Sequence, residues 1–119
     1  MILSLLMAML AAEPDDYRAA VAVRKPMVVV ITASWCGVCP STKKSVQVLA
    51  KKHGLLFAEV DYDRYRDLSL RIMSGRVVPE TVFYSLVEPP IRVIGADPAK
   101  LARAAEECRR AAASKTQSR

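Results

Sequence analysis

The spacing of apolar and polar residues along the chain predicts four strands. Met27 to Ile31 is apolar at every position and too short for a typical helix, a pattern typical of a buried central strand. Leu55 to Val60 predicts a second strand. Thr81 to Ser85 and Ile91 to Ile94 predict two more, and the short proline-containing turn between them favours an antiparallel hairpin.

Apolar residues at helical spacing predict helices around these strands. Gly54 and Gly75 fit the C-terminal ends of two helices, and Asp97 followed by Pro98 provides an N-cap and a proline at the first helical position. The expected helices cover Asp15 to Arg24, Pro40 to about His53, about Arg64 to Ser74, and Pro98 to about Ala113.

The order of these elements predicts one α/β domain. A helix links the first two strands, and a right-handed crossover of this kind makes them parallel, whereas the last two strands form a hairpin. A chain of 119 residues with 52% hydrophobic content is long enough to bury one core. We therefore expect a mixed four-stranded sheet flanked by helices on both faces, spanning residues 13–113, followed by a basic flexible tail at 114–119.

Residues 1–12 are almost wholly apolar and precede an acidic, proline-containing stretch. This pattern resembles a short secretory signal, although no Lys or Arg comes before the apolar run. The segment is too short to span a bilayer comfortably, and a helix packed on the domain is the alternative. We slightly favour export to the periplasm or cell envelope over a cytoplasmic location.

The formal net charge of +6 favours acidic partners, of which nucleic acid is the first candidate. However, the basic residues are scattered over several segments and gather only at the C-terminus, which is typical of solvated helix faces and a tail. No zinc-finger spacing or aromatic RNA-binding strand accompanies them. We therefore expect no nucleic-acid partner, and we expect a monomer.

The chain has three cysteines, and two of them, Cys36 and Cys39, form a C-x-x-C pair directly after the first strand. Such a pair can close and reopen a small disulfide ring, which stores and releases two electrons. At a helix N-terminus the helix dipole and free N–H groups favour the thiolate. Because the first cysteine of such a turn is usually the more exposed, we expect Cys36 to be the nucleophile and Cys39 the resolving thiol.

A zinc site is the main chemical alternative for a C-x-x-C pair, because such pairs also form half of many metal sites. A closed site needs about four ligands, and the other soft ligands are Cys108 and His53, neither of which has paired spacing. We read His53 as a polar residue at a helix end and Cys108 as a small packing residue. We therefore expect no metal and no organic cofactor.

The chain resembles the thioredoxin family over roughly Asp15 to Ala113. The most specific stretch is Ala33-Ser34-Trp35-Cys36-Gly37-Val38-Cys39, and Val60-Asp61-Tyr62-Asp63 is similar to the family's strand ending in an acidic turn. Gly75-Arg76-Val77-Val78-Pro79 resembles the stretch that ends in the family's cis-proline, and Ile94-Gly95-Ala96 resembles a loop beside it. The resemblance implies a substrate-docking surface built from Trp35, Gly37, Val38, Val78, Pro79 and Gly95.

Several residues depart from the family's pattern. Val38 stands where a proline is usual, and Val30 stands where many members bury an aspartate that takes the proton of the second cysteine. Glu59, on a nearby strand, is our candidate for a substitute proton acceptor, with a solvated strand-edge glutamate as the alternative. Glu80, directly after Pro79, is also atypical, and we expect it to disfavour acidic substrates.

The resemblance implies a thiol–disulfide oxidoreductase that exchanges electrons with protein disulfides or dithiols through Cys36 and Cys39. A second redox partner would re-reduce or re-oxidise the pair, and the compartment decides the direction of electron flow. Two alternatives stay open: a thioredoxin-like module that binds peptides with little redox turnover, and a metal carrier that uses the same two cysteines.

Overall fold

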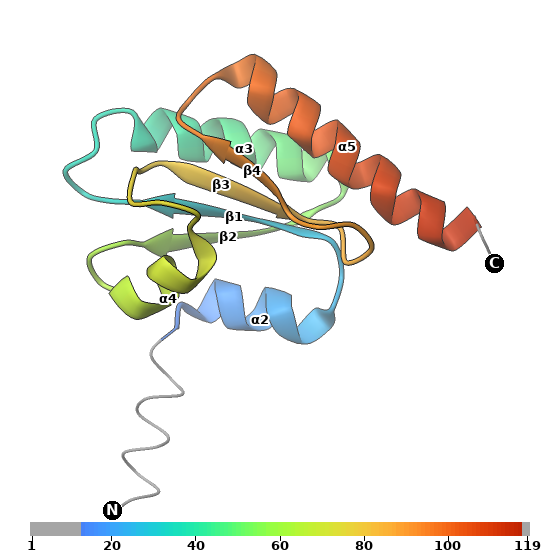
Figure 1. Cartoon of the computed structure of the whole chain (residues 1–119), viewed down its shortest axis with the longest axis horizontal. Helices are drawn as coiled ribbons and strands as arrows, with labels where there is room; N and C mark the ends of the chain where they lie inside the picture. Colours follow the sequence, from blue (N-terminus) through green and yellow to red (C-terminus); the bar gives the residue numbers. More distant parts are fainter. Residues whose placement is uncertain (1–12, 118–119) are drawn as a thin grey trace, which may run out of the picture.

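A computed structural model describes residues 13–117, and the expectations for residues 1–12 lie outside this range. The chain folds into alternating helices and strands (Figure 1). In chain order the elements are α2 Asp15–Val23, β1 Met27–Thr32, α3 Cys39–His53, β2 Leu56–Asp61, α4 Arg66–Ile72, β3 Glu80–Tyr84, β4 Ile91–Ile94 and α5 Pro98–Gln117.

The strands form one mixed sheet in the order β2-β1-β3-β4, as predicted. β1 pairs in parallel with β2 and antiparallel with β3, and β3 pairs antiparallel with β4. Helices α2 and α4 lie on one face of the sheet, and α3 and α5 lie on the other (Figure 1). This arrangement confirms the expected α/β fold with helices on both faces.

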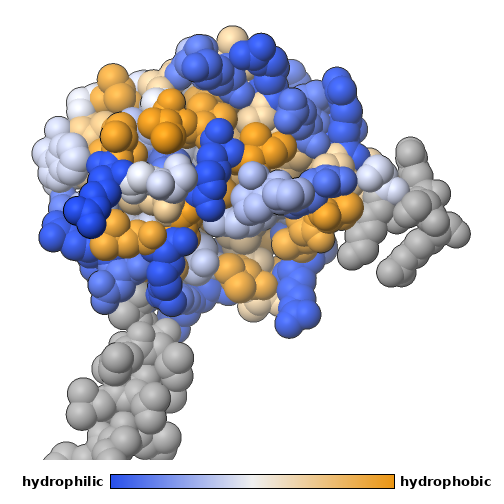
Figure 2. Space-filling view, viewed as in Figure 1, coloured by the Kyte–Doolittle hydropathy of each residue, from blue (hydrophilic) through white to orange (hydrophobic). Residues whose placement is uncertain are grey.

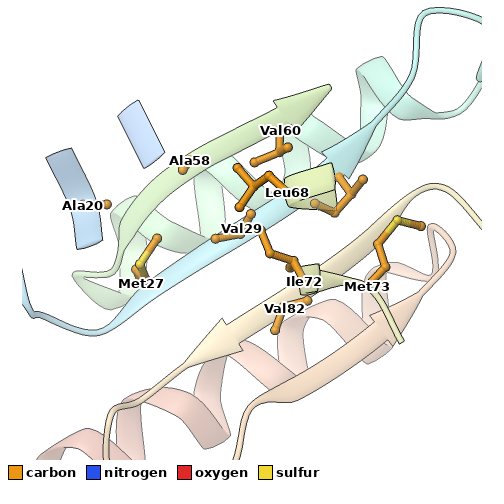
Figure 3. Packing of buried hydrophobic residues seen from close by; sticks show 10 residues of the cluster. Ala20, Met27, Val29, Ala58, Val60, Leu68, Ile72, Met73 and Val82 are labelled. Atoms are coloured by element: carbon orange, nitrogen blue, oxygen red, sulfur yellow. The ribbon is translucent and has the colours of Figure 1, made fainter. Parts of the chain in front are cut away.

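The central strand β1 is buried at all of its positions because it lies between two helical layers. Val29 belongs to the core under α2 and α4, together with Leu68 and Val82 (Figure 3). Ile31 belongs to the same core. Val28 belongs to the opposite core, under α3 and α5. Burial on both faces explains why the β1 sequence is continuously apolar rather than alternating.

Helix α3 ends as its sequence predicts, and α5 runs further than expected. Gly54 has a φ of 68°, and its N–H bonds to the Ala50 carbonyl as a left-handed C-cap. Helix α5 continues past Ala113 to Gln117 because no glycine or proline interrupts it there.

Across residues 13–117, we find no helix with both the length and the apolar character that crossing a membrane requires.

The prediction of a helix from Arg64 to Ser74, stopped by Gly75, is wrong at both ends. At the start, Oδ1 of Asp61 accepts hydrogen bonds from the backbone N–H groups of Asp63 and Arg64, which hold these residues in a turn. At the end, Met73 is extended, with φ −72° and ψ 147°. Arg92 of β4 binds the carbonyl of Ile72 in the last turn of α4, and Glu80 of β3 binds Ser74 just beyond the helix. These tertiary contacts hold the chain out of the helix before Gly75.

Candidate active site

The disulfide between Cys36 and Cys39 lies where β1 passes into α3. The two Cα atoms are 5.4 Å apart, and the Cys36 N–H bonds to the Ala33 carbonyl at 3.1 Å, which closes the turn before the helix. Cys39 is the first residue of α3 and only 2% exposed, whereas Cys36 is partly exposed. Solvent and substrate therefore reach the Cys36 sulfur more readily than the Cys39 sulfur.

The N-terminus of α3 provides a favourable electrostatic setting for a thiolate. The first turn of the helix carries no acidic side chain, and Pro40 occupies an early position where a missing N–H costs no intrahelical bond. The positive end of the helix dipole therefore faces the two sulfurs without a compensating carboxylate in that turn. This setting stabilises a negative charge on sulfur relative to the thiol.

Trp35 precedes the first cysteine and is 65% exposed. Its indole Nε1–H donates a 2.8 Å hydrogen bond to Oδ2 of Asp63, a residue that follows β2. The other oxygen of Asp63 accepts a 3.2 Å bond from Arg66 on α4. An exposed aromatic ring is thus fixed beside the disulfide by residues from two other parts of the chain.

The segment before β3 lies beside the active-site loop. The Val78–Pro79 peptide bond is cis, which confirms the expected cis-proline. Ile31 pairs with Glu80, so the end of β1 that leads to Cys36 lies next to the start of β3. The Pro79 carbonyl accepts a 2.9 Å bond from Gly95 N–H, which brings together two of the segments expected to form the docking surface.

Apolar side chains remain exposed on these segments. Val38 is 51% exposed, Val77 58% and Ile94 51%. Gly95 has a φ of 98°, a conformation that favours glycine, and it lets the chain turn sharply after β4. Val77 and the side chain of Ile94 were not among the expected docking residues, although both lie within stretches that carried the resemblance. In the view of Figure 2, apolar areas are small and are separated by hydrophilic side chains.

A cavity of about 250 Å³ lies beside the disulfide, and Glu59 forms part of its wall together with Cys36, Cys39 and Lys43. Oε1 of Glu59 lies 2.8 Å from Nζ of Lys43, and Oε2 accepts a 2.7 Å hydrogen bond from the Thr32 hydroxyl. Lys43 and Thr32 were not recognised from the sequence. The i, i+4 spacing of Cys39 and Lys43, which puts both on one face of α3, was the available signal.

The contacts of Glu59 control its protonation. Burial alone raises the pKa of this carboxyl, but hydrogen bonds from Lys43 and Thr32, together with the Lys43 charge, outweigh burial and hold the pKa below its ordinary value. Val30, the neighbour of Glu59 in the β1–β2 register, is fully buried. The two carboxylates that line the disulfide cavity, Glu59 and Asp61, both belong to β2 and not to β1.

Glu80, directly after Pro79, does not lie on the surface. Its side chain is 0% exposed and points into the molecule, where a substrate does not reach it, so the expectation that it disfavours acidic substrates is wrong. A carboxylate at the start of a strand is normally solvated, and only its tertiary partners, Ser74 and Arg92, explain its burial.

Neither Cys108 nor His53 lines the disulfide cavity. Cys108 is fully buried in the core under α3 and α5, where burial raises the pKa of its thiol to about 11. Nδ1 of His53 lies 3.5 Å from Glu106 on α5. Within residues 13–117, no three His, Cys, Asp or Glu side chains come together in a way that would hold a metal ion.

Comparison with known proteins agrees with this geometry. The family model described as thioredoxin matches residues 8–107. Thioredoxin H7 of Arabidopsis thaliana is 35% identical over 86 residues, and the match covers 71% of this chain and 66% of that relative, so the chain spans slightly less than two thirds of its length. Deadhead, a germline-specific thioredoxin of Drosophila melanogaster, superposes with a TM-score of 0.65 at 28% identity, covering 76% of this chain and 88% of its own. Fasciola hepatica thioredoxin gives a TM-score of 0.62 at 30% identity, covering 70% and 80%.

Proposed function

Because this chain belongs to the thioredoxin family, we propose that it exchanges electrons with protein disulfides and dithiols through Cys36 and Cys39. The observation that carries the proposal is the disulfide at the N-terminus of α3, with a partly exposed Cys36 and a buried Cys39. The two sulfurs themselves hold the two electrons, so the exchange needs neither a metal nor an organic cofactor.

In the reducing direction, the Cys36 thiolate attacks one sulfur of a substrate disulfide. A bond forms between Cys36 and that sulfur, the substrate S–S bond breaks, and the other substrate sulfur leaves as a thiolate. Cys39 then loses its proton and attacks the Cys36 sulfur, which re-forms the Cys36–Cys39 disulfide and releases the second substrate thiolate. The substrate gains two electrons and two protons, and a second redox partner reverses the change in the protein.

The docking surface accounts for a preference for protein substrates. Trp35, Gly37, Val38, Val78, Pro79 and Gly95 would contact an extended segment that carries the substrate disulfide. Val78 supports this role because it belongs to neither β3 nor α4, and no backbone hydrogen bond of Val78 occurs in the part of the chain that the structure describes. Its N–H and carbonyl are available to pair with a substrate strand, as in β-augmentation.

Glu59 is the proposed acceptor for the Cys39 proton. Its carboxylate shares the 250 Å³ cavity with Cys39, and a cavity of this size has room for water to relay a proton. The lowered pKa keeps Glu59 ionised at neutral pH, which is the form that accepts a proton, but it also makes the carboxylate a weak base, so the proton would pass on to water and not stay on Glu59. Lys43 would then balance the charge of the carboxylate before the transfer.

Reduction of insulin by dithiothreitol, followed as turbidity, tests the function. The chain should accelerate precipitation over dithiothreitol alone, Cys36→Ser should abolish the acceleration, and Cys108→Ser should retain it because Cys108 lies outside the site. If the unaltered chain gives no acceleration, the proposal fails, and a peptide-binding module with little redox turnover becomes the better interpretation.

A further inference from the structure

A buried carboxylate directly follows the cis-proline. The two side-chain oxygens of Glu80 accept bonds from the Ser74 backbone N–H at 3.1 and 3.0 Å, and one of them also accepts the Ser74 hydroxyl at 3.0 Å. The carboxylate is 0% exposed, so each of these bonds replaces one that water would otherwise make. Glu80, the first residue of β3, thereby binds Ser74 near the start of the connection between α4 and β3.

Arg92 of β4 completes this network. Its Nη1 lies 3.1 Å from Oε2 of Glu80 and also donates a hydrogen bond to the carbonyl of Ile72, the last residue of α4. Val82 pairs with Arg92 in the β3–β4 ladder, so Arg92 and Glu80 both lie on the face of the sheet that α4 covers. One guanidinium therefore connects the end of the helix to the buried carboxylate.

Strand β4 thus holds the segment 73–79 at both ends. At the start of the segment, Arg92 binds the carbonyl of Ile72 and the carboxylate of Glu80. At its end, the N–H of Gly95, directly after β4, binds the carbonyl of Pro79. Between these attachments, Arg76 and Val77 remain exposed. The segment is fixed at its base while its central residues face solvent.

We propose that Glu80 and Arg92 are positioning residues for substrate docking, which hold Val77 and Val78 in register with the active-site loop. This inference rests on the proposed function, since it names the residues that prepare the docking edge. The pair does not touch the reacting sulfurs. It acts through the segment 73–79. Because the pair already holds this segment rigid, less conformational entropy is lost when a substrate docks on it.

A purely structural pair would be a weaker explanation of the geometry. The Glu80 carboxylate is fully buried, whereas the Arg92 side chain is 35% exposed. Because the carboxylate loses its hydration, such a pair is often no better for stability than well-packed apolar residues of similar volume. Here the two charged groups bind the end of α4 and the Ser74 backbone and hydroxyl, and these contacts converge on one loop. Apolar residues could fill the same volume, but they could not accept or donate these bonds.

Four variants of the full chain test the inference. Glu80→Gln removes the charge and keeps an acceptor oxygen, and Arg92→Met removes both contacts of the guanidinium. Ser74→Ala is a mild variant that removes only the hydroxyl bond and should fold normally. Glu88→Gln, in the exposed turn between β3 and β4, is the matched control for loss of a glutamate charge.

Three measurements separate positioning from stability: amide hydrogen exchange by residue, the KM and kcat for insulin against those for a small aromatic disulfide, and the rate of Cys36 alkylation against pH. We expect Arg92→Met to speed exchange at residues 74–78 about tenfold, equivalent to about 1.4 kcal/mol, while amides of β1 keep their protection. The KM for insulin should rise, whereas turnover of the small disulfide and the alkylation profile of Cys36 should not change. Ser74→Ala should show the same pattern to a lesser degree.

Three outcomes would overturn the inference: exchange that rises equally throughout the sheet, insulin and small-disulfide reduction that fall together, or variants that match Glu88→Gln. If the unaltered chain reduces insulin and the variants leave the KM ratio unchanged, the positioning role alone fails. If the unaltered chain does not reduce insulin, the proposed function fails first and the docking role fails with it.

Discussion

Trp35 and Asp63 are joined across the carboxyl-terminal end of the sheet by a 2.8 Å hydrogen bond from the indole to the carboxylate. Asp63 is itself held in place, because its backbone N–H binds Asp61 and its carboxylate binds Arg66. The bond links the loop after β1 to the turn after β2. An aromatic side chain with most of its surface in solvent therefore keeps one orientation beside Cys36.

Replacing Asp63 with alanine should free the Trp35 ring. Because Trp35 is the chain's one tryptophan, its fluorescence anisotropy reports the motion directly, and we expect the anisotropy to fall in Asp63→Ala. Reduction of insulin should slow by a few-fold, since a mobile ring has to be ordered on docking. Asp63→Asn keeps an acceptor oxygen and serves as the control. Equal anisotropy in all three proteins would contradict the proposed role of the bond.

Brief alkylation of the reduced protein near neutral pH should label Cys36 first. Cys36 is partly exposed at a helix N-terminus, whereas Cys39 is buried, and Cys108 is both buried and, with a thiol pKa of about 11, almost wholly protonated. Mass spectrometry after quenched labelling measures the order. Preferential labelling of Cys108 would mean that the reactive thiol has been misassigned.

The two active-site cysteines should differ when each is replaced by serine. Cys39→Ser retains the nucleophile but cannot resolve the adduct, so a mixed disulfide between Cys36 and a substrate protein should accumulate. Cys36→Ser should form little adduct because the buried Cys39 sulfur is poorly accessible. Non-reducing gels show the adduct, and Cys108→Ser is the control. If both variants trap equal amounts of the mixed disulfide, the assignment of Cys36 as the nucleophile and Cys39 as the resolving thiol is wrong.

The fold was largely predictable because its elements have local causes. The continuous apolar run of β1, the left-handed Gly54 after α3, and Asp97 with Pro98 before α5 each determine structure within a few residues. The C-x-x-C pair after a buried strand likewise located the disulfide before any tertiary information was used.

What the sequence did not reveal depends on residues far apart in the chain. The end of α4 is set by Arg92, twenty residues after Ile72, and not by the nearby Gly75. Glu80 appeared to be a surface charge because nothing in its neighbourhood in the sequence indicates that Arg92 and Ser74 would enclose it. The ion pair of Lys43 with Glu59 is a tertiary contact of the same kind. Local patterns predict elements, whereas the partners of a buried charge become known only when the elements are packed.

The free energy of unfolding, measured as the pH is lowered, should depend on the environment of Glu59. A pKa held below its ordinary value of 4.5 means that the folded state favours the carboxylate over the protonated acid. Glu59 therefore contributes stability that is fully present above the unfolded-state pKa and is lost as pH falls through the lower, folded-state pKa. Glu59→Gln should destabilise the protein at neutral pH, and its difference from the unaltered chain should shrink in acid.

Lys43→Met provides the sharper test, because it removes a contact that lowers the pKa of Glu59 and leaves the burial that raises it. The folded-state pKa of Glu59 should then rise towards its unfolded-state value, so the loss of stability that Glu59 contributes on acidification should be smaller than in the unaltered chain. Urea unfolding at a series of pH values measures both variants, with Glu88→Gln as the control. If Glu59 also accepts the Cys39 proton, Glu59→Gln should slow release of the mixed disulfide in single-turnover experiments without slowing its formation. If Glu59→Gln changes the stability in acid but not the rate at which the mixed disulfide is released, Glu59 is only a structural partner of Lys43. Another group must then accept the Cys39 proton.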